Sequence, residues 1–256
     1  MDAGAELPDG ELTLVARIPS ASNAAFLALI DETPVIYKPS AGEQPLWDFP
    51  EGDLAQREVA AYLVSEAMGW NIVPPTCVRD GPLGEGMVQL WREPARAVRS
   101  VELVSPELPP AHGFRRVFAA IGDPDFPVAI DHEDSAELRR IAVFDVVVNN
   151  ADRKGGHILE MAGGHRHGVD HGLTFHVDDK LRTVLWGWAG DELTDAERTG
   201  VGRVRAALSG ALGRDLAELL SPAELELLDF RCELLLAEGR FPSPRGSWHV
   251  VPWPLL

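Results

Sequence analysis

Hydrophobic and polar positions in the first third of the chain alternate mainly with the period of strands, and one stretch has the period of a helix. The alternation predicts four short strands, at residues 12–18, 25–30, 34–38 and 87–91. The sequence Asp53-Leu-Ala-Gln56 is a capping-box pattern that begins a helix, and Gly69 stands where that helix would end. These elements together predict an α+β unit with a small antiparallel sheet over residues 1–92.

Beyond Pro94 the pattern becomes mainly helical. Apolar spacing predicts a helix over 135–148, and two capping boxes, Thr194–Glu197 and Ser221–Glu224, predict the start of two more. Two short strands and an irregular tail rich in Pro and Trp are expected at 157–161, 173–177 and 241–256. We therefore expect a second, larger unit over residues 93–256.

The composition is that of a globular protein, with 45% hydrophobic and 25% charged residues among 256. The net charge of −17 argues against nucleic acid or an anionic membrane as the main partner, because both favour clustered Lys and Arg. Cys77 and Cys232 are expected as two reduced thiols, with a single disulfide as the alternative. No signal-peptide pattern and no apolar run of about 18 residues is present, which predicts a cytoplasmic protein without stable membrane association.

Lys38 and Glu58 form the first candidate pair. Lys38 ends the apolar strand 35–37, and Glu58 lies one helical turn after Leu54, at the border of an apolar stripe. Either residue alone has the pattern of a solvated surface side chain. A strand lysine followed twenty residues later by a glutamate in mid-helix is, however, the arrangement that holds ATP phosphates in kinases.

Three further candidates follow the helix predicted over 135–148. That helix runs into Asp152-Arg153, then two glycines, His157 and a short apolar strand. Asp170 follows thirteen residues after His157 and is itself followed two positions later by glycine, the spacing of a metal-binding Asp in kinase-like folds. The alternatives are a loop salt bridge between Asp152 and Arg153 and a turn-forming role for Asp170. The order and spacing of the lysine, the glutamate and the two aspartates favour a kinase-like site over these alternatives.

Four segments carry a resemblance to known families: VIYKPSAGEQP, LAQREVAAYLVSEAMG, VVNNADRKGGHIL and VDHGLTF. They resemble phosphatidylinositol 3- and 4-kinases, especially the type II 4-kinases. Most of the chain resembles an uncharacterised actinobacterial family of phosphatidylinositol 3/4-kinase-like proteins. The toxin–antitoxin kinase HipA has similar motifs. The resemblance implies a bilobal protein-kinase-like fold of the α+β class. In that fold a small N-lobe of antiparallel sheet and one helix faces a larger, mainly helical C-lobe, with ATP between them.

The resemblance also implies roles for the candidate residues. Lys38 would contact the nucleotide phosphates, and Glu58 would orient Lys38. Asp152 would accept the proton of the attacking hydroxyl, and Asp170 and His157 would hold Mg²⁺ or Mn²⁺ against the phosphates. The phosphate-covering loop and the hinge beside adenine would be supplied by Ser20, Ser22 and Asn23, and by Gln89, Leu90 and Trp91.

Two departures from the family pattern affect the expected metal and the expected rate of phosphate transfer. The segment Pro19–Asn23 contains no glycine, so its hydroxyls and amides would have to reach phosphate without that flexibility. His157 stands where an asparagine usually binds the second metal, and imidazole suits Mn²⁺ or Zn²⁺ better than Mg²⁺. We expect an ATP-dependent phosphotransferase because Asp152 is present, and the alternative is a non-catalytic nucleotide-binding pseudokinase or scaffold.

The expected acceptor is a hydroxyl on a protein or on a small polar metabolite. An anionic lipid headgroup is disfavoured, because the segment after Asp170 balances its two basic residues with two acidic ones, Lys180, Arg182, Asp178 and Asp179. Other nucleotide chemistry on the same fold, such as AMP transfer, is an alternative.

Five of the eight histidines lie within 20 residues and suggest a rival site. His165, His167 and His171 are of a type that binds transition metals, but their spacing matches no zinc motif. The glycines that flank His165 and His167 favour a solvated hairpin tip instead.

Overall fold

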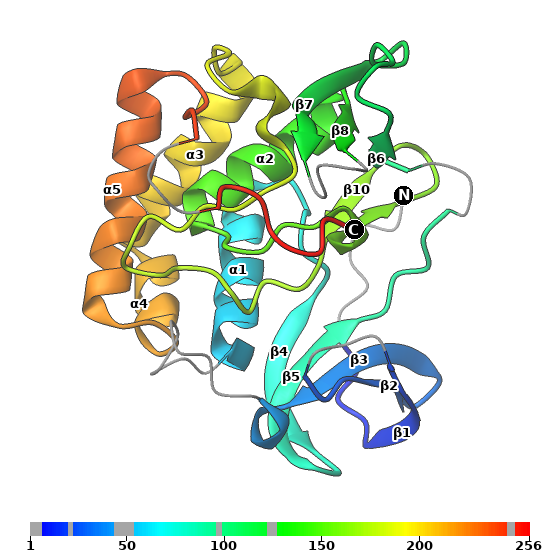
Figure 1. Ribbon diagram of the computed structural model, residues 1–256. Helices are drawn as coiled ribbons and strands as arrows, with labels where there is room; N and C mark the ends of the chain where they lie inside the picture. Colours follow the sequence, from blue (N-terminus) through cyan, green and yellow to red (C-terminus); the bar gives the residue numbers. More distant parts are fainter. Residues whose placement is uncertain (1–6, 20–22, 44–53, 96–98, 122–126, 245–248) are drawn as a thin grey trace.

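The computed structural model describes residues 7–19, 23–43, 54–95, 99–121, 127–244 and 249–256. Its N-terminal part is a five-stranded antiparallel sheet in the order β1-β2-β3-β5-β4 (Figure 1). The strands are β1 Leu12–Arg17, β2 Phe26–Ile30, β3 Thr33–Pro39, β4 Thr76–Gly81 and β5 Gly84–Leu90. The four strands predicted from alternation are confirmed. The sequence did not predict β4, because this strand lies at the sheet edge, only Thr76 in it is buried, and it therefore shows no alternation.

The helix α1, Leu54–Met68, follows a single 3₁₀ turn, η1 (Ser40–Gly42), and lies between the N-terminal sheet and the remaining helices (Figure 1). It ends before Gly69, as predicted, and Gly69 adopts φ +73°, which favours glycine. Asp53, the first residue of the predicted capping box, lies outside the described residues. The backbone amides of Leu54 and Ala55 donate to the carboxylate of Glu43 at 3.0 and 3.1 Å, which satisfies two N-terminal donors of α1.

A second antiparallel sheet occupies the region where the sequence predicted mainly helix. It consists of β6 Val101–Val104, β7 Phe114–Ile121 and β8 Val128–Glu133, in the order β6-β8-β7. The prediction was wrong because β8 buries polar side chains that hide the alternation of a strand. Asp131 pairs with Arg116 of β7, and the His132 ring accepts a hydrogen bond from the Gly187 amide at 3.0 Å.

The rest of the described chain carries four helices: α2 Ala136–Val148, α3 Asp195–Leu208, α4 Ala211–Ala217 and α5 Pro222–Glu238. Capping boxes at Thr194 and Ser221 begin α3 and α5 as predicted. Between α2 and α3 lie two 3₁₀ turns and a short hairpin: η2 Gly155–His157, η3 Trp186–Trp188, β9 Ile158–Glu160 and β10 Arg166–Gly168. The strand predicted over 173–177 does not form, because Phe175 has φ +61° and its amide bonds to Val148 O.

The helix α1 shares its buried face with the larger part of the molecule. Ala60, Val64 and Met68 of α1 belong to one apolar core with residues of α2, α3, α4 and α5. The N-terminal sheet has its own small core around Val35 and Tyr37. The division between residues 92 and 93 stays a prediction.

The C-terminal residues cross the helical part without regular structure (Figure 1). In residues 241–244 and 249–256 no helix or strand forms, as predicted for an irregular tail. Val250 O accepts from Trp186 Nε1 at 2.8 Å, and Leu255 O accepts from the Gly155 amide at 2.9 Å. This tail therefore braces the loop that contains Asp152.

The cysteines and the helices can each be compared with the expectation from the sequence. Cys77 and Cys232 are both free thiols, the first partly buried and the second fully buried. None of the helices built from the described residues has the length and apolar character needed to cross a membrane.

Candidate active site

Lys38, Glu58 and Asp170 come from three separate parts of the chain and meet at one point. On β3 the neighbouring Tyr37 faces the small sheet core, so Lys38 points to the opposite side, toward α1. Its Nζ donates to Glu58 Oε1 and to Asp170 Oδ1, each at 2.7 Å. Glu58 is only 2% exposed, so it points inward from α1. The sequence placed the first two residues together, and the structure adds Asp170 to them.

Glu58 also holds the backbone beside Asp170. Its second carboxylate oxygen accepts a hydrogen bond from the His171 amide at 2.8 Å. Burial acts to lower the pKa of Lys38, but the charges of Asp170 and Glu58 outweigh it and raise that pKa above its ordinary value. The charge of Lys38 in turn is the main cause that holds the pKa of Asp170 well below its usual range. The lysine and Asp170 are therefore both charged at neutral pH.

Arg153 is a fully buried cation that links the two loops of the site, and sequence reasoning gave it no such role. It forms an ion pair with Asp145 of α2 at 2.8 Å, not with Asp152 as the salt-bridge alternative suggested. Its Nη1 donates to His157 O at 3.1 Å and to Val169 O at 3.2 Å. One guanidinium thus fixes the loop after α2 against the residue that precedes Asp170.

His171 completes this connection. Its Nε2 lies 2.7 Å from Arg153 Nη2, and since arginine only donates, Nε2 accepts. Burial lowers the pKa of His171 well below its usual value, so the ring is neutral and carries its proton on Nδ1. A sequence signal for Arg153 did exist: Asp145 is an acidic residue inside an otherwise apolar helical stretch, and such a residue needs a buried partner.

Asp152 lies at the start of the same loop. Its backbone amide donates to Asn150 Oδ1 at 2.9 Å, and its carboxylate accepts from Lys154 Nζ at 2.8 Å. Burial raises the pKa of Asp152 against the opposing effect of Lys154. A carboxylate with a raised pKa is a better proton acceptor than an exposed one. Lys154, which holds this carboxylate, was not identified from the sequence.

His157 faces Asp170 from the other end of the loop. Its Nε2 lies 3.3 Å from Asp170 Oδ2, and its buried Nδ1 has no hydrogen-bond partner among the described residues. Burial lowers the pKa of His157 to about 4, so the imidazole is neutral at pH 7 and can offer a lone pair. Asp170 adopts φ +61°, which supports the turn-forming alternative, but its carboxylate is half exposed toward the site.

A cavity of about 240 Å³ contains these groups. Its walls come from β3, β5, α1 and the two loops described above. The lining residues include Lys38, Glu58, Asp152 and Asp170 but not His157 or Arg153, and the full set is Asn23, Ala24, Ala25, Lys38, Pro39, Glu43, Leu54, Ala55, Glu58, Met87, Asp152, Lys154, Asp170, Gly172 and Leu173. The arrangement offers fixed cationic donors and carboxylates in one enclosed space.

The residues predicted for the hinge do not line this cavity. Gln89 is buried and donates to Thr76 Oγ1 at 2.9 Å. The amides of Leu90 and Trp91 donate to Pro75 O and Pro34 O at 2.9 and 3.0 Å, so neither amide is available to a nucleobase. In the sheet, β5 pairs with β3 as far as Leu90 and with β4 as far as Gln89.

Of the three residues predicted for the phosphate-covering loop, one lies among the described residues. Asn23 lines the cavity, whereas Ser20 and Ser22 lie outside the described residues.

The histidines of the β9–β10 hairpin are not a solvated tip, contrary to expectation. Gly163 and Gly164 form the exposed turn, but His167 is only 3% exposed and its Nδ1 lies 3.1 Å from Ile72 O. His165 Nε2 lies 2.9 Å from Asn71 O. These rings attach the hairpin to the segment between α1 and β4. In the part of the chain that the structure describes, no three His, Cys, Asp or Glu side chains are grouped to hold a metal.

The solved structures that match this chain are distant in sequence. No protein-family model matches the chain. Among solved structures, the proinflammatory kinase CtkA of Helicobacter pylori covers 89% of this chain and 93% of its own, at 10% identity and a TM-score of 0.43. HipA of Shewanella oneidensis MR-1, from a complex with HipB and operator DNA, covers 92% and 73%, at 12% identity and a TM-score of 0.38. TM-scores below 0.5 are too low to establish a common fold.

The curated relative is much closer. Protein Rv2133c of Mycobacterium tuberculosis is 49% identical over 265 residues, which span 99% of this chain and 95% of the relative. The chain therefore belongs to the family of protein Rv2133c.

Proposed function

We propose that this protein is an ATP-dependent phosphotransferase with a protein-kinase-like fold, which transfers the γ-phosphate to a hydroxyl of a protein or of a small polar metabolite. One observation carries the proposal. Lys38 of a five-stranded sheet, Glu58 of the adjacent helix and Asp170 of a distant loop meet within hydrogen-bond distance in a cavity that also holds Asp152. Phosphoryl transfer requires just such fixed charges around the phosphates.

Lys38 supplies the positive charge for the phosphates. A lysine ammonium has three donors, and Glu58 and Asp170 accept two of them, which leaves one for a phosphate oxygen. Because Glu58 is buried and also bonded to the His171 amide, it holds Lys38 in place rather than competing for substrate. Glu58 is therefore a positioning residue in this proposal.

Asp152 is the proposed general base. The acceptor hydroxyl would attack the γ-phosphorus, the bond to the β,γ-bridging oxygen would break, and the hydroxyl proton would pass to the Asp152 carboxylate. Its raised pKa makes it a better proton acceptor, and its bond to Lys154 keeps the carboxylate oriented in the cavity.

A divalent cation would bind beside Asp170 and His157. Asp170 offers a half-exposed carboxylate, and neutral His157 offers an imidazole nitrogen 3.3 Å from it, with its other ring nitrogen unpartnered among the described residues. These two residues would hold Mg²⁺ or Mn²⁺, whose chemistry is to neutralise the phosphate charge. The imidazole favours Mn²⁺.

The second candidate is a nucleotide-binding protein without turnover. One observation favours it: a histidine, His157, occupies the place where an asparagine was expected to bind the second metal. The phosphatidylinositol 3/4-kinase-like assignment made from the motifs stays a prediction, and the relative's name does not bear on substrate.

One experiment separates these possibilities. We would measure ATP affinity by calorimetry and release or transfer of the γ-phosphate from labelled ATP, with Mg²⁺ and Mn²⁺ compared. The variants are Lys38→Met, Asp152→Asn and the surface control Arg240→Gln, whose side chain pairs with Glu192 on the exterior. Turnover that is lost in the first two variants and kept in the third supports a phosphotransferase. Nucleotide binding without turnover supports the second candidate, and the absence of both refutes both.

A further inference from the structure

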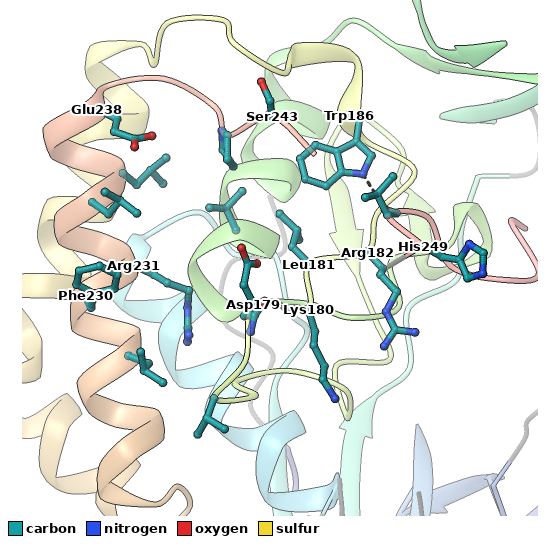
Figure 2. Close-up of a pocket in the computed structure, with 18 residues that line it drawn as sticks. Asp179, Lys180, Leu181, Arg182, Trp186, Phe230, Arg231, Glu238, Ser243 and His249 are labelled. Carbon is teal, nitrogen blue, oxygen red and sulfur yellow. Dashed lines mark hydrogen bonds between the residues drawn. The ribbon is translucent and has the colours of Figure 1, made fainter. Parts of the chain in front are cut away.

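A second cavity, of about 190 Å³, lies between α5 and the segment that follows Asp170, and it has no part in the proposed phosphotransfer (Figure 2). One wall is the face of α5 that carries Phe230, Arg231 and Leu234, and another is the segment 177–182. Trp186 and Val250 close a third side and are joined by the hydrogen bond from Trp186 Nε1 to Val250 O, 2.8 Å long.

The walls are apolar and partly open to solvent. Val177, Phe230 and Leu234 are 47%, 54% and 36% exposed, and all three line this cavity. Exposed large apolar side chains are ordinary when scattered, but several around one hollow mark a binding surface. The volume is slightly larger than the cavity of about 150 Å³ that takes up benzene in an engineered protein. It therefore suits a single medium-length aliphatic chain or a single aromatic ring.

Arg231 gives the cavity a positive charge. It extends from α5 toward the segment that carries Asp179 (Figure 2), and its Nε donates to Val147 O at 2.9 Å. Its Nη2 is buried and has no hydrogen-bond partner among the described residues. Burial lowers the pKa of Arg231 to about 10, which reflects the cost of an under-paired buried cation. A carboxylate is the planar acceptor that a guanidinium pairs with best.

The charged residues that line the cavity, Arg231 included, have a net positive charge. Among the lining residues Lys180, Arg182 and Arg231 outnumber Asp179 and Glu238, and His249 lies beyond Arg182 (Figure 2). No ion pair joins Arg231 to Asp179 in the described structure, although the Asp179 charge opposes the fall of the Arg231 pKa. The local sign is opposite to that of the whole protein, whose net charge is −17.

We propose that this cavity binds a small apolar carboxylate, such as a medium-chain aliphatic acid, with its carboxylate on Arg231 and its chain against Phe230, Leu234 and Val177. The inference does not depend on the proposed phosphotransfer, because it rests on a separate cavity and separate residues.

The test uses the full chain and three probes of the same length: octanoate, octan-1-ol and octylammonium, each titrated by calorimetry below its aggregation concentration. We expect saturable binding of octanoate, at one site, at least tenfold tighter than that of octylammonium. Arg231→Gln should weaken octanoate binding by about tenfold or more, since it removes a charge-assisted hydrogen bond, and should change octan-1-ol binding by less than threefold.

Two further variants locate the site. Val177→Trp, at an exposed position that should tolerate a larger side chain, should fill the cavity and abolish binding of both octanoate and octan-1-ol. Arg205→Gln is the matched control: Arg205 also pairs with α5, through Asp229 and Glu233, but lies outside the cavity. It should leave every affinity unchanged.

Several results would overturn the proposal: no saturable octanoate binding to the wild-type chain, octylammonium binding as tight as octanoate, or octanoate binding that survives Val177→Trp. Should Arg231→Gln fail to fold, as its melting temperature would reveal, the Val177→Trp result decides alone.

Discussion

Breaking the buried pair of Arg153 and Asp145 is the perturbation that tests the framework of the site most directly. Both side chains are 0% exposed, and Arg153 also donates hydrogen bonds to His157 O and Val169 O. Arg153→Met would leave the Asp145 carboxylate with the Asn150 side-chain amide alone, at 2.9 Å, and would remove the arginine donor from Val169 O, while His157 O would keep the Val169 amide. Removing one partner of a buried pair costs about 3–5 kcal/mol of the free energy of unfolding.

The double variant distinguishes this mechanism from simple loss of packing. Asp145→Leu should cost about as much as Arg153→Met, because each leaves one buried charge. Combining the two removes both charges, so the double variant should be more stable than the sum of the single costs by roughly 2 kcal/mol or more. For a chain of this size each single variant should melt roughly 6–20 °C lower than the wild type.

The assay is urea unfolding of the wild type, both single variants and the double variant, with nucleotide affinity measured on every variant that is folded. Arg205→Met is the control, since that arginine is exposed and its ion pairs should contribute about 1 kcal/mol or less. A cost below about 1 kcal/mol for Arg153→Met, or strictly additive costs in the double variant, would refute the reasoning.

The remaining predictions concern the site and its pH dependence. Asp170→Asn should lower metal-dependent ATP affinity tenfold or more, as measured by calorimetry. Asp152→Asn should change that affinity only a few fold and should lower turnover of labelled ATP by about 10²–10⁴. The reverse pattern would contradict the assigned roles. His157→Asn should raise turnover with Mg²⁺ relative to Mn²⁺, and an unchanged ratio speaks against His157 as a ligand. Burial lowers the pKa of His132 and His167 to about 4, so between about pH 4 and 6.5 the unfolded chain binds more protons. The free energy of unfolding should therefore fall as pH drops through that window, and a constant urea midpoint from pH 7 to 4.5 would contradict this.

The central residues of the site could be predicted because local periodicity fixes the direction of their side chains. On a strand, a buried Tyr37 turns its neighbour Lys38 to the other face, and on a helix, Glu58 follows the buried stripe. Those two directions permit the pair, and the kinase-like arrangement of a strand lysine and a mid-helix glutamate predicted it. The position of Asp170 depends on tertiary contacts, and there the kinase-like spacing supplied what periodicity could not.

Other parts could not be predicted, because their signals depend on partners distant in sequence. The strand β8 buries Asp131 and His132, which read as surface residues until Arg116 and Gly187 are known to satisfy them. The bonding of the residues predicted for the hinge was hidden for a related reason. Nothing in residues 89–91 reveals that their amides are already bonded within the sheet and its borders.

The segment 169–171 shows how the fold prepares the site before any ligand arrives. Val169 O is held by Arg153, the Asp170 carboxylate by Lys38, and the His171 amide by Glu58. Each of three consecutive residues is thus tied to a different element, and two of the ties are to buried groups. A group fixed in this way loses little conformational freedom when a ligand binds, so more of the interaction energy remains for affinity and for the reaction. The same ties explain why the backbone can keep Asp170 in its left-handed conformation, which a residue other than glycine adopts only when its surroundings impose it.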